Sequence, residues 1–149
     1  MAESVERKKM TMAERITELR RKKTQLLDAG GQDRIAKQHK AGKLTARERV
    51  EQLLDNDSFQ EMNAFAAHRC TFFGMDKKEV PYDGVITGYG TVQGRLVHVA
   101  SQDFTVIGGA VGEVHADKIV DMAQGALKSG SPLVLINDSG GARIQEGID

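Results

Sequence analysis

The segment that most constrains the fold is a four-residue apolar run, Leu133–Ile136, between a helical pattern and a glycine-rich turn. Such a short run without polar residues is typical of a strand buried on both faces. Residues 111–128 before it predict an amphipathic helix with Gly130 at its C-cap. Asn137-Asp-Ser-Gly-Gly141 after it predicts a tight turn. Strand, helix, strand and turn together predict a right-handed crossover unit and therefore an α/β fold.

The composition changes near residue 56. The preceding residues are charged, helix-prone and almost free of β-branched side chains, whereas Val, Ile, Thr and many of the 16 glycines follow. Capping boxes that begin at Thr11 and Thr45 predict the starts of two helices. Gly30-Gly31 predicts the end of the first, and residues 33–40 a further helix. We therefore predict a helical N-terminal arm over 1–56 and an α/β domain over 57–149.

The region after the arm predicts mainly strands. Residues 58–62 predict a short strand, and 86–92 with 95–100 predict a hairpin closed by Gln93-Gly94. Residues 64–82 fit neither the helical nor the strand period. Residues 143–146 predict the first turn of a helix.

Charge, cysteine content and hydropathy exclude several classes of protein. The 21 basic and 21 acidic residues cancel, so no field favours nucleic acid or an anionic membrane. Cys70 is the only cysteine, which excludes an internal disulfide and zinc-ribbon spacing. No apolar signal sequence begins the chain, and no run approaches the roughly 20 residues of a membrane span. The four histidines form no metal-ligand pattern. A reducing cytoplasm is the simplest location.

Two glycine-rich turns are candidate sites. The turn Asp138–Arg143 follows a strand and precedes a helix, so its amides can face outward and hold an anion or an oxyanion. On glycine count alone, an ordinary strand-to-helix turn is the favoured interpretation. A nucleophilic Ser139 does not fit the G-x-S-x-G pattern. The turn Ser101–Gly112 lacks both the dinucleotide fingerprint and a Walker A lysine, so alone it indicates no nucleotide.

Five segments in order resemble the carboxyltransferase β subunit of biotin-dependent acyl-CoA carboxylases such as propionyl-CoA carboxylase. These segments are Lys37–His39, Gly42–Arg49, Asp83–Gly88, Ser101–Thr105 with Gly108-Gly109, and Asn137–Gly147. Methylmalonyl-CoA decarboxylase and the large transcarboxylase subunit share this signature. The resemblance runs from about residue 28 to the end.

The resemblance implies a crotonase-like (ClpP/crotonase) fold, here an incomplete N-terminal carboxyltransferase domain after the helical arm. It implies transfer of carboxylate between carboxybiotin and the α-carbon of a short acyl-CoA. It also implies that backbone amides hold the enolate oxygen, which reverses the preference for an ordinary turn. One of these amides is expected from the turn Gly140-Gly141-Ala142, and the choice between Gly141 and Ala142 stays open. The implied CoA-binding residues are Phe104, Thr105, Val106, Gly108, Gly109 and Arg143.

The same resemblance implies partners and cofactors. Biotin is expected on a biotin carboxyl carrier protein or domain, loaded by biotin carboxylase, with acyl-CoA as substrate and no metal bound by this chain. Biotin itself is the expected base, and a homo-oligomer, a hexamer in the family, is the expected assembly. Because family subunits are several times longer, we expect this polypeptide alone to be inactive. The alternatives are a CoA-binding module and a subunit-interaction module without catalysis. The acyl group stays open, as does the choice among carboxylation, decarboxylation and transfer.

Overall fold

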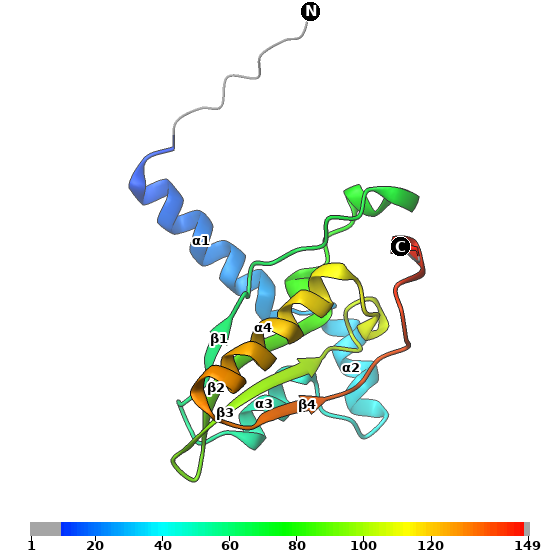
Figure 1. The fold of residues 1–149 in the computed structure, drawn as a ribbon. Coiled ribbons are helices and arrows are strands. Elements are labelled where there is room, and N and C mark those ends of the chain that lie inside the picture. Colours follow the sequence, from blue (N-terminus) through cyan, green and yellow to red (C-terminus); the bar gives the residue numbers. More distant parts are fainter. Residues whose placement is uncertain (1–9, 148–149) are drawn as a thin grey trace, which may run out of the picture.

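A computed structural model describes residues 10–147 and shows a four-stranded sheet between helices (Figure 1). The strands are β1 (Gln60–Met62), β2 (Val85–Val92), β3 (Arg95–Gln102) and β4 (Leu133–Ile136). They lie in the order β1-β2-β3-β4, antiparallel for the first two pairings and parallel between β3 and β4.

The α-helices are α1 (Met12–Leu27), α2 (Gln32–Lys40), α3 (Ala46–Leu53) and α4 (Glu113–Ser129). The 3₁₀ helices are η1 (Phe72–Lys77), η2 (Pro81–Gly84), η3 (Ile107–Gly109) and η4 (Ile144–Glu146).

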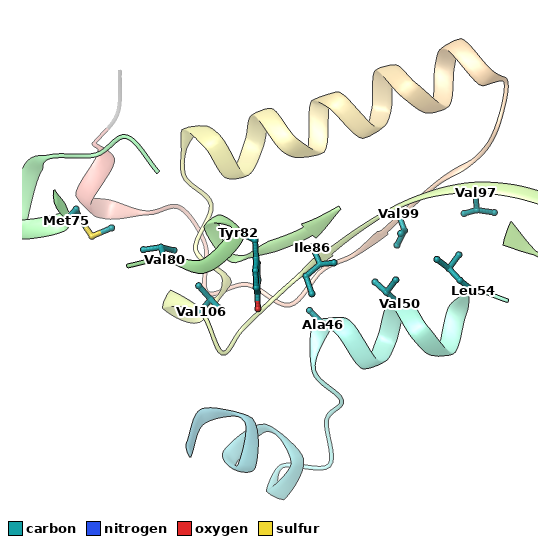
Figure 2. Packing of buried hydrophobic residues seen from close by; sticks show 10 residues of the cluster. All are labelled: Ala46, Val50, Leu54, Met75, Val80, Tyr82, Ile86, Val97, Val99 and Val106. Atoms are coloured by element: carbon teal, nitrogen blue, oxygen red, sulfur yellow. The ribbon is translucent and has the colours of Figure 1, made fainter. Parts of the chain in front are cut away.

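The sheet has α4 on one face and α3 on the other (Figure 2). Successive side chains of β3 point to opposite faces of the sheet. Val97 and Val99 belong to the hydrophobic cluster that includes α3. His98 and Gln102 lie on the opposite face, where Gln102 contacts His115 of α4. The predicted α/β class is therefore confirmed.

The hydrophobic cluster lies between α3, β2, β3 and the loops that follow β1 and β3 (Figure 2). Val50 and Val99 have no exposed surface. Burying side chains of this size stabilises the fold by roughly 1.5–3 kcal/mol each. The buried members are Ala46, Val50, Leu54, Met75, Val80, Tyr82, Ile86, Val97, Val99 and Val106.

The capping boxes and the hairpin are where the sequence places them. Both Thr11 and Thr45 accept a hydrogen bond from the amide three residues later, and each glutamate there bonds back. Gln93 and Gly94 both have positive φ, at 51° and 75°, as a type I′ turn requires. The Asp55 carboxylate accepts hydrogen bonds from both turn amides.

The end of α1 differs from the prediction. The helix ends at Leu27, and Ala29 rather than a glycine turns the chain, with φ of 49°. Gly31 instead is the N-cap of α2. A Cβ on Gly30 would lie 1.8 Å from the Thr105 carbonyl oxygen. Gly30 is therefore required for a close approach between two segments, which local sequence does not indicate.

The predicted burial of β4 on both faces is wrong. Leu135 is 47% exposed, and the other three residues of β4 are half-buried. Among the described residues β4 pairs only with β3, so it forms an edge of the sheet. The predicted helix start at 143–146 is a single 3₁₀ turn, after which Gly147 has φ of 76°.

The first helix projects from the body of the molecule (Figure 1). None of its residues is buried, and Met12, Ile16 and Leu19 are exposed. No helix within residues 10–147 is long and apolar enough to cross a membrane. The segment 64–82, which fitted neither period, contains η1 and the beginning of η2.

Candidate functional site

The two glycine-rich turns lie side by side. The Gly140 N–H donates to the Gly108 carbonyl oxygen at 2.8 Å. Val111 and Ala142 then form a parallel bridge: the Val111 N–H donates to the Gly141 oxygen at 2.9 Å, and the Arg143 N–H to the Val111 oxygen at 2.8 Å. The tertiary structure thus brings the two candidate turns together.

The three candidate amides differ in what they bind. The Gly140 N–H is bonded to Gly108, and the Gly141 N–H donates to the Ser139 hydroxyl oxygen at 3.1 Å. The Ala142 N–H has no acceptor within residues 10–147. Because successive N–H groups of an extended segment point in opposite directions, it faces away from Val111. Among the three, Ala142 has the amide available to a ligand.

Ala142 lines a cavity of about 510 Å³ between its own turn, the start of α4 and the loop before η1. Cys70 lines it as well, and its thiol lies 3.3 Å from the Gln145 carbonyl oxygen. Phe72 is 69% exposed at the same cavity. The remaining lining residues are Arg69, Thr71, Val111, Gly112, Glu113, Arg143, Glu146 and Gly147.

Arg143, which the resemblance implies as a CoA-binding residue, has a fully buried side chain. Its guanidinium donates to Asp83 Oδ1 at 2.6 Å, to Glu146 Oε1 at 2.8 Å and to the Ala110 carbonyl oxygen at 3.0 Å. Glu146 in turn accepts the Glu113 N–H at the start of α4. Asp83 from η2 and Glu146 from the same turn as Arg143 thus hold the cation inside the protein.

Asp83, the partner of Arg143, is held in an unusual conformation. Its φ is 50°, a region that costs a non-glycine residue about 1 kcal/mol or more. His115 Nδ1 lies 2.9 Å from the Asp83 carbonyl oxygen, and Lys118 Nζ donates to the neighbouring Tyr82 oxygen at 2.8 Å. Burial raises the pKa of the Asp83 carboxyl, and Arg143 opposes that shift.

Burial also shifts the two α4 side chains that hold this segment. It lowers the pKa of His115 to about 4 and the pKa of Lys118 to about 8. His115 is therefore neutral at pH 7, with Nδ1–H donating to Asp83. Its Nε2 then accepts from the Gln102 amide at 3.2 Å, and Gln102 Oε1 accepts the Asp138 N–H. A buried chain of hydrogen bonds joins η2 to the candidate turn.

The predicted CoA segment, residues 104–109, is fixed by Asp103. Its Oδ1 accepts both the N–H and the hydroxyl of Thr105, and its Oδ2 accepts the Tyr82 hydroxyl at 2.6 Å. Phe104 is 44% exposed, whereas Val106 is part of the hydrophobic cluster. Phe104, Thr105 and Gly108 line a cavity, and Val106 and Gly109 are buried behind it.

That second cavity, of about 420 Å³, is basic. Arg34, Lys37 and Lys43 line it, opposite the predicted segment. Arg34 Nη1 donates to the Thr105 carbonyl oxygen at 3.1 Å, and the Lys43 Nζ lies 5.6 Å from the centre of the Phe104 ring. Sequence reasoning missed these cations. Lys37 lies in a segment that carried the resemblance, but no pattern there indicated a ligand.

Asp138 joins the basic cavity to the candidate turn. Its carboxylate accepts hydrogen bonds from Arg49 at 2.7 Å, Gln38 at 3.0 Å and Lys43 at 3.2 Å. Gln38 and Lys43 both line the basic cavity. The helical arm is thus part of the site.

The histidines do not form a metal site. His39 pairs with Glu48, and His98 contacts Ser131. Between residues 10 and 147, no three His, Cys, Asp or Glu side chains are grouped to hold a metal ion.

Comparison with known proteins gives one family. The Carboxyl transferase domain matches residues 37–149. The chain is 54% identical over 139 residues to methylmalonyl-CoA decarboxylase subunit alpha of Veillonella parvula, covering 93% of this chain and 27% of the relative. It is 52% identical over 139 residues to the carboxyltransferase subunit of propionyl-CoA carboxylase of Haloferax mediterranei, with the same coverage of each.

The fold is similar to solved structures of the same kind. A transcarboxylase 12S structure with hydrolysed methylmalonyl-coenzyme A bound, described as a hexamer assembly, superposes with a TM-score of 0.89 at 53% identity, covering 94% of this chain and 27% of that one. A single-chain long-chain acyl-CoA carboxylase gives a TM-score of 0.78 at 29% identity, covering 95% of this chain and 15% of that one. The chain spans about 27% of the length of the first of these curated relatives.

Proposed function

Because the chain belongs to the carboxyl transferase domain family, we propose that it binds a short acyl-CoA and contributes to moving carboxylate between carboxybiotin and the acyl α-carbon. The fold is the crotonase-like α/β fold of its structural neighbours. Methylmalonyl-CoA and propionyl-CoA are named for its relatives, so short acyl groups are the substrates that we propose.

The basic cavity supports binding of coenzyme A. Coenzyme A carries diphosphate and ribose-phosphate groups, and lysine and arginine are the side chains that bind phosphate. Arg34, Lys37 and Lys43 present three such cations around Phe104, whose exposed ring offers an apolar surface. We propose that the phosphates bind here and that the pantetheine arm passes Gly108 towards Ala142.

The Ala142 amide is the observation that carries the proposal. Removing or replacing a group at the α-carbon of a thioester places negative charge on the thioester oxygen. A donor fixed in advance stabilises that charge without reorganising. The Ala142 N–H lies in a turn fixed by backbone bonds on both sides, has no acceptor within residues 10–147 and borders a cavity. We therefore choose Ala142 over Gly141 as the donor.

Carboxybiotin, when bound, would supply the carboxyl group and, after loss of carbon dioxide, the base. We assign no described residue of this chain to holding biotin. We propose that it arrives on a biotin carboxyl carrier protein or domain served by biotin carboxylase, and that the protein acts as a homo-oligomer. The hexamer described for the transcarboxylase 12S structure supports the last point. The free thiol of Cys70 favours a reducing compartment such as the cytoplasm.

Calorimetric titration of the purified chain with coenzyme A and with propionyl-CoA tests the proposal. We expect both to bind, more weakly at higher salt, because phosphate contacts are screened. Arg34→Gln with Lys37→Gln should raise Kd by about tenfold or more, the equivalent of about 1.4 kcal/mol. Lys128→Gln, an exposed lysine of α4 outside the basic cavity, should leave Kd unchanged. Equal Kd for all variants would contradict the assignment of the basic cavity.

The exposed stripe of α1 supports a second candidate, a subunit-interaction module without catalysis. A 16-residue helix with no buried residue gains little from packing, and short isolated helices are marginal in water. Light scattering of the chain with and without residues 1–27 separates the candidates. If the chain binds coenzyme A and the number of chains per particle is the same with and without residues 1–27, the interaction module is contradicted.

A further inference from the structure

Arg143 follows the proposed oxyanion donor in the chain and lines the same cavity, although its side chain is buried. Its side chain has no exposed surface, and its charge is met by Asp83 and Glu146. Burying a guanidinium costs several kcal/mol unless carboxylates and further hydrogen bonds satisfy it. This cost suggests a role beyond packing, since an apolar side chain fills the same volume without it.

The contacts of Arg143 fix the turn on the C-terminal side of Ala142. Its backbone N–H donates to the Val111 carbonyl oxygen, and its guanidinium donates to the Ala110 carbonyl oxygen at 3.0 Å. One residue therefore bonds two consecutive carbonyls of the neighbouring turn. These bonds hold the parallel bridge in register and leave the Ala142 N–H directed away from Val111.

The same guanidinium joins three segments that are distant in sequence. Asp83 comes from η2, Glu146 from η4, and Glu146 also accepts the Glu113 N–H at the start of α4. A Cβ on Gly112 would lie 2.5 Å from the Glu146 carboxylate and 2.7 Å from Arg143 Nη1. The network therefore fills the space between the turn and α4, so the turn has little room to move.

We propose that Arg143 is a positioning residue, which aims the Ala142 amide at the thioester oxygen through its bonds to Asp83, Glu146 and the Ala110 carbonyl. The proposal rests on the function proposed above. In this proposal Arg143 acts through its neighbours and does not contact CoA directly. Arginine suits this position because the donors of its planar fork are spread over separate nitrogens that reach Asp83, Glu146 and the Ala110 carbonyl, whereas all the donors of lysine lie on one nitrogen.

The thioester carbonyl of a bound substrate analogue reports this positioning. Propionyl-CoA labelled with carbon-13 at the carbonyl is titrated into the 149-residue chain, and the carbonyl chemical shift is read at saturation. A hydrogen bond from Ala142 polarises the carbonyl and moves its resonance downfield of free propionyl-CoA. We expect this shift in the wild-type chain. In Arg143→Lys we expect most of it to be lost, with Kd within about twofold of wild type because the phosphate contacts are unchanged.

Arg34→Gln is the matched contrast. It removes a cation of the basic cavity, so Kd rises, but at saturation the downfield shift stays as in wild type. Asp83→Asn is the second variant if Arg143→Lys does not fold, because asparagine tolerates the positive φ of 50° at this position and removes the charge that Arg143 pairs with. We expect Asp83→Asn also to lose most of the shift at nearly unchanged Kd.

Two results overturn the proposal: Arg143→Lys that keeps the downfield shift at saturation, whatever its Kd, or a wild-type chain that binds propionyl-CoA without a shift. A wild-type chain that binds no propionyl-CoA refutes the proposed function instead. Amide hydrogen exchange then tests the positioning alone. Compared with wild type, Arg143→Lys must lose protection of the backbone amides at Val111 and at position 143, while Val99 in β3 stays protected. Wild-type protection at all three amides overturns the proposal.

Discussion

Protonation of His115 should destabilise the fold at mildly acidic pH. The side chain is fully buried, and burial lowers its pKa to about 4 from 6.5. Between these values the unfolded chain binds a proton that the folded chain does not, so stability falls as pH falls. At pH 4 the free energy of unfolding should be about 3 kcal/mol lower than at pH 8. The pKa difference of about 2.5 units, at 1.36 kcal/mol per unit, sets this size, and the value is slightly reduced because the folded chain also binds some protons at pH 4.

The hydrogen bonds around His115 give the physical reason. Its Nδ1–H donates to the Asp83 carbonyl oxygen, and its Nε2 accepts from Gln102. A proton on Nε2 would face the Gln102 amide donor. Turning that amide would satisfy the proton but would withdraw Gln102 Oε1 from the Asp138 N–H. Protonation is therefore unfavourable at the ring and disturbs the turn before Ala142.

Urea unfolding from pH 4 to pH 8 measures the effect, with His115→Asn as the control. Asparagine retains a donor for the Asp83 carbonyl and does not titrate. The unfolding free energy of wild type should fall between pH 8 and pH 4 by about 3 kcal/mol more than that of the variant. Proton NMR gives the pKa of the imidazole directly. Equal pH dependence of the two proteins, or an imidazole pKa near 6.5, would refute the reasoning.

Other consequences concern glycines, cavities and turnover. Gly109→Ala should lower the free energy of unfolding by about 1–3 kcal/mol more than Gly42→Ala, as measured by thermal unfolding. Both glycines have positive φ, but only at Gly109 would a Cβ lie 2.3 Å from the Asp138 carbonyl oxygen. Gly30→Ala should weaken coenzyme A binding by calorimetry, because it displaces Thr105 at the basic cavity. The purified chain should bind propionyl-CoA without turning it over in a carboxybiotin assay, because the turn offers one available amide; measurable turnover would contradict this.

Much of the secondary structure follows from local sequence because its causes are local. The capping boxes at Thr11 and Thr45 need only four residues, and the Gln93-Gly94 turn only two. The glycine pair after β4 identified the candidate turn for the same reason. The end of α1 was misplaced because Gly30 does not cap the helix. It allows a close approach to Thr105, which lies 75 residues away in the sequence.

Tertiary structure decided which residues of the site are available to a ligand. Sequence could not separate Gly140, Gly141 and Ala142, because the acceptor of one amide lies at Gly108 on another turn. Nor did it indicate that Arg143 is enclosed by Asp83, 60 residues earlier, or that Arg34 and Lys43 face Phe104. Local hydrogen bonds determine helices and turns, whereas burial and charge pairing depend on which segments meet, and only the folded chain settles that.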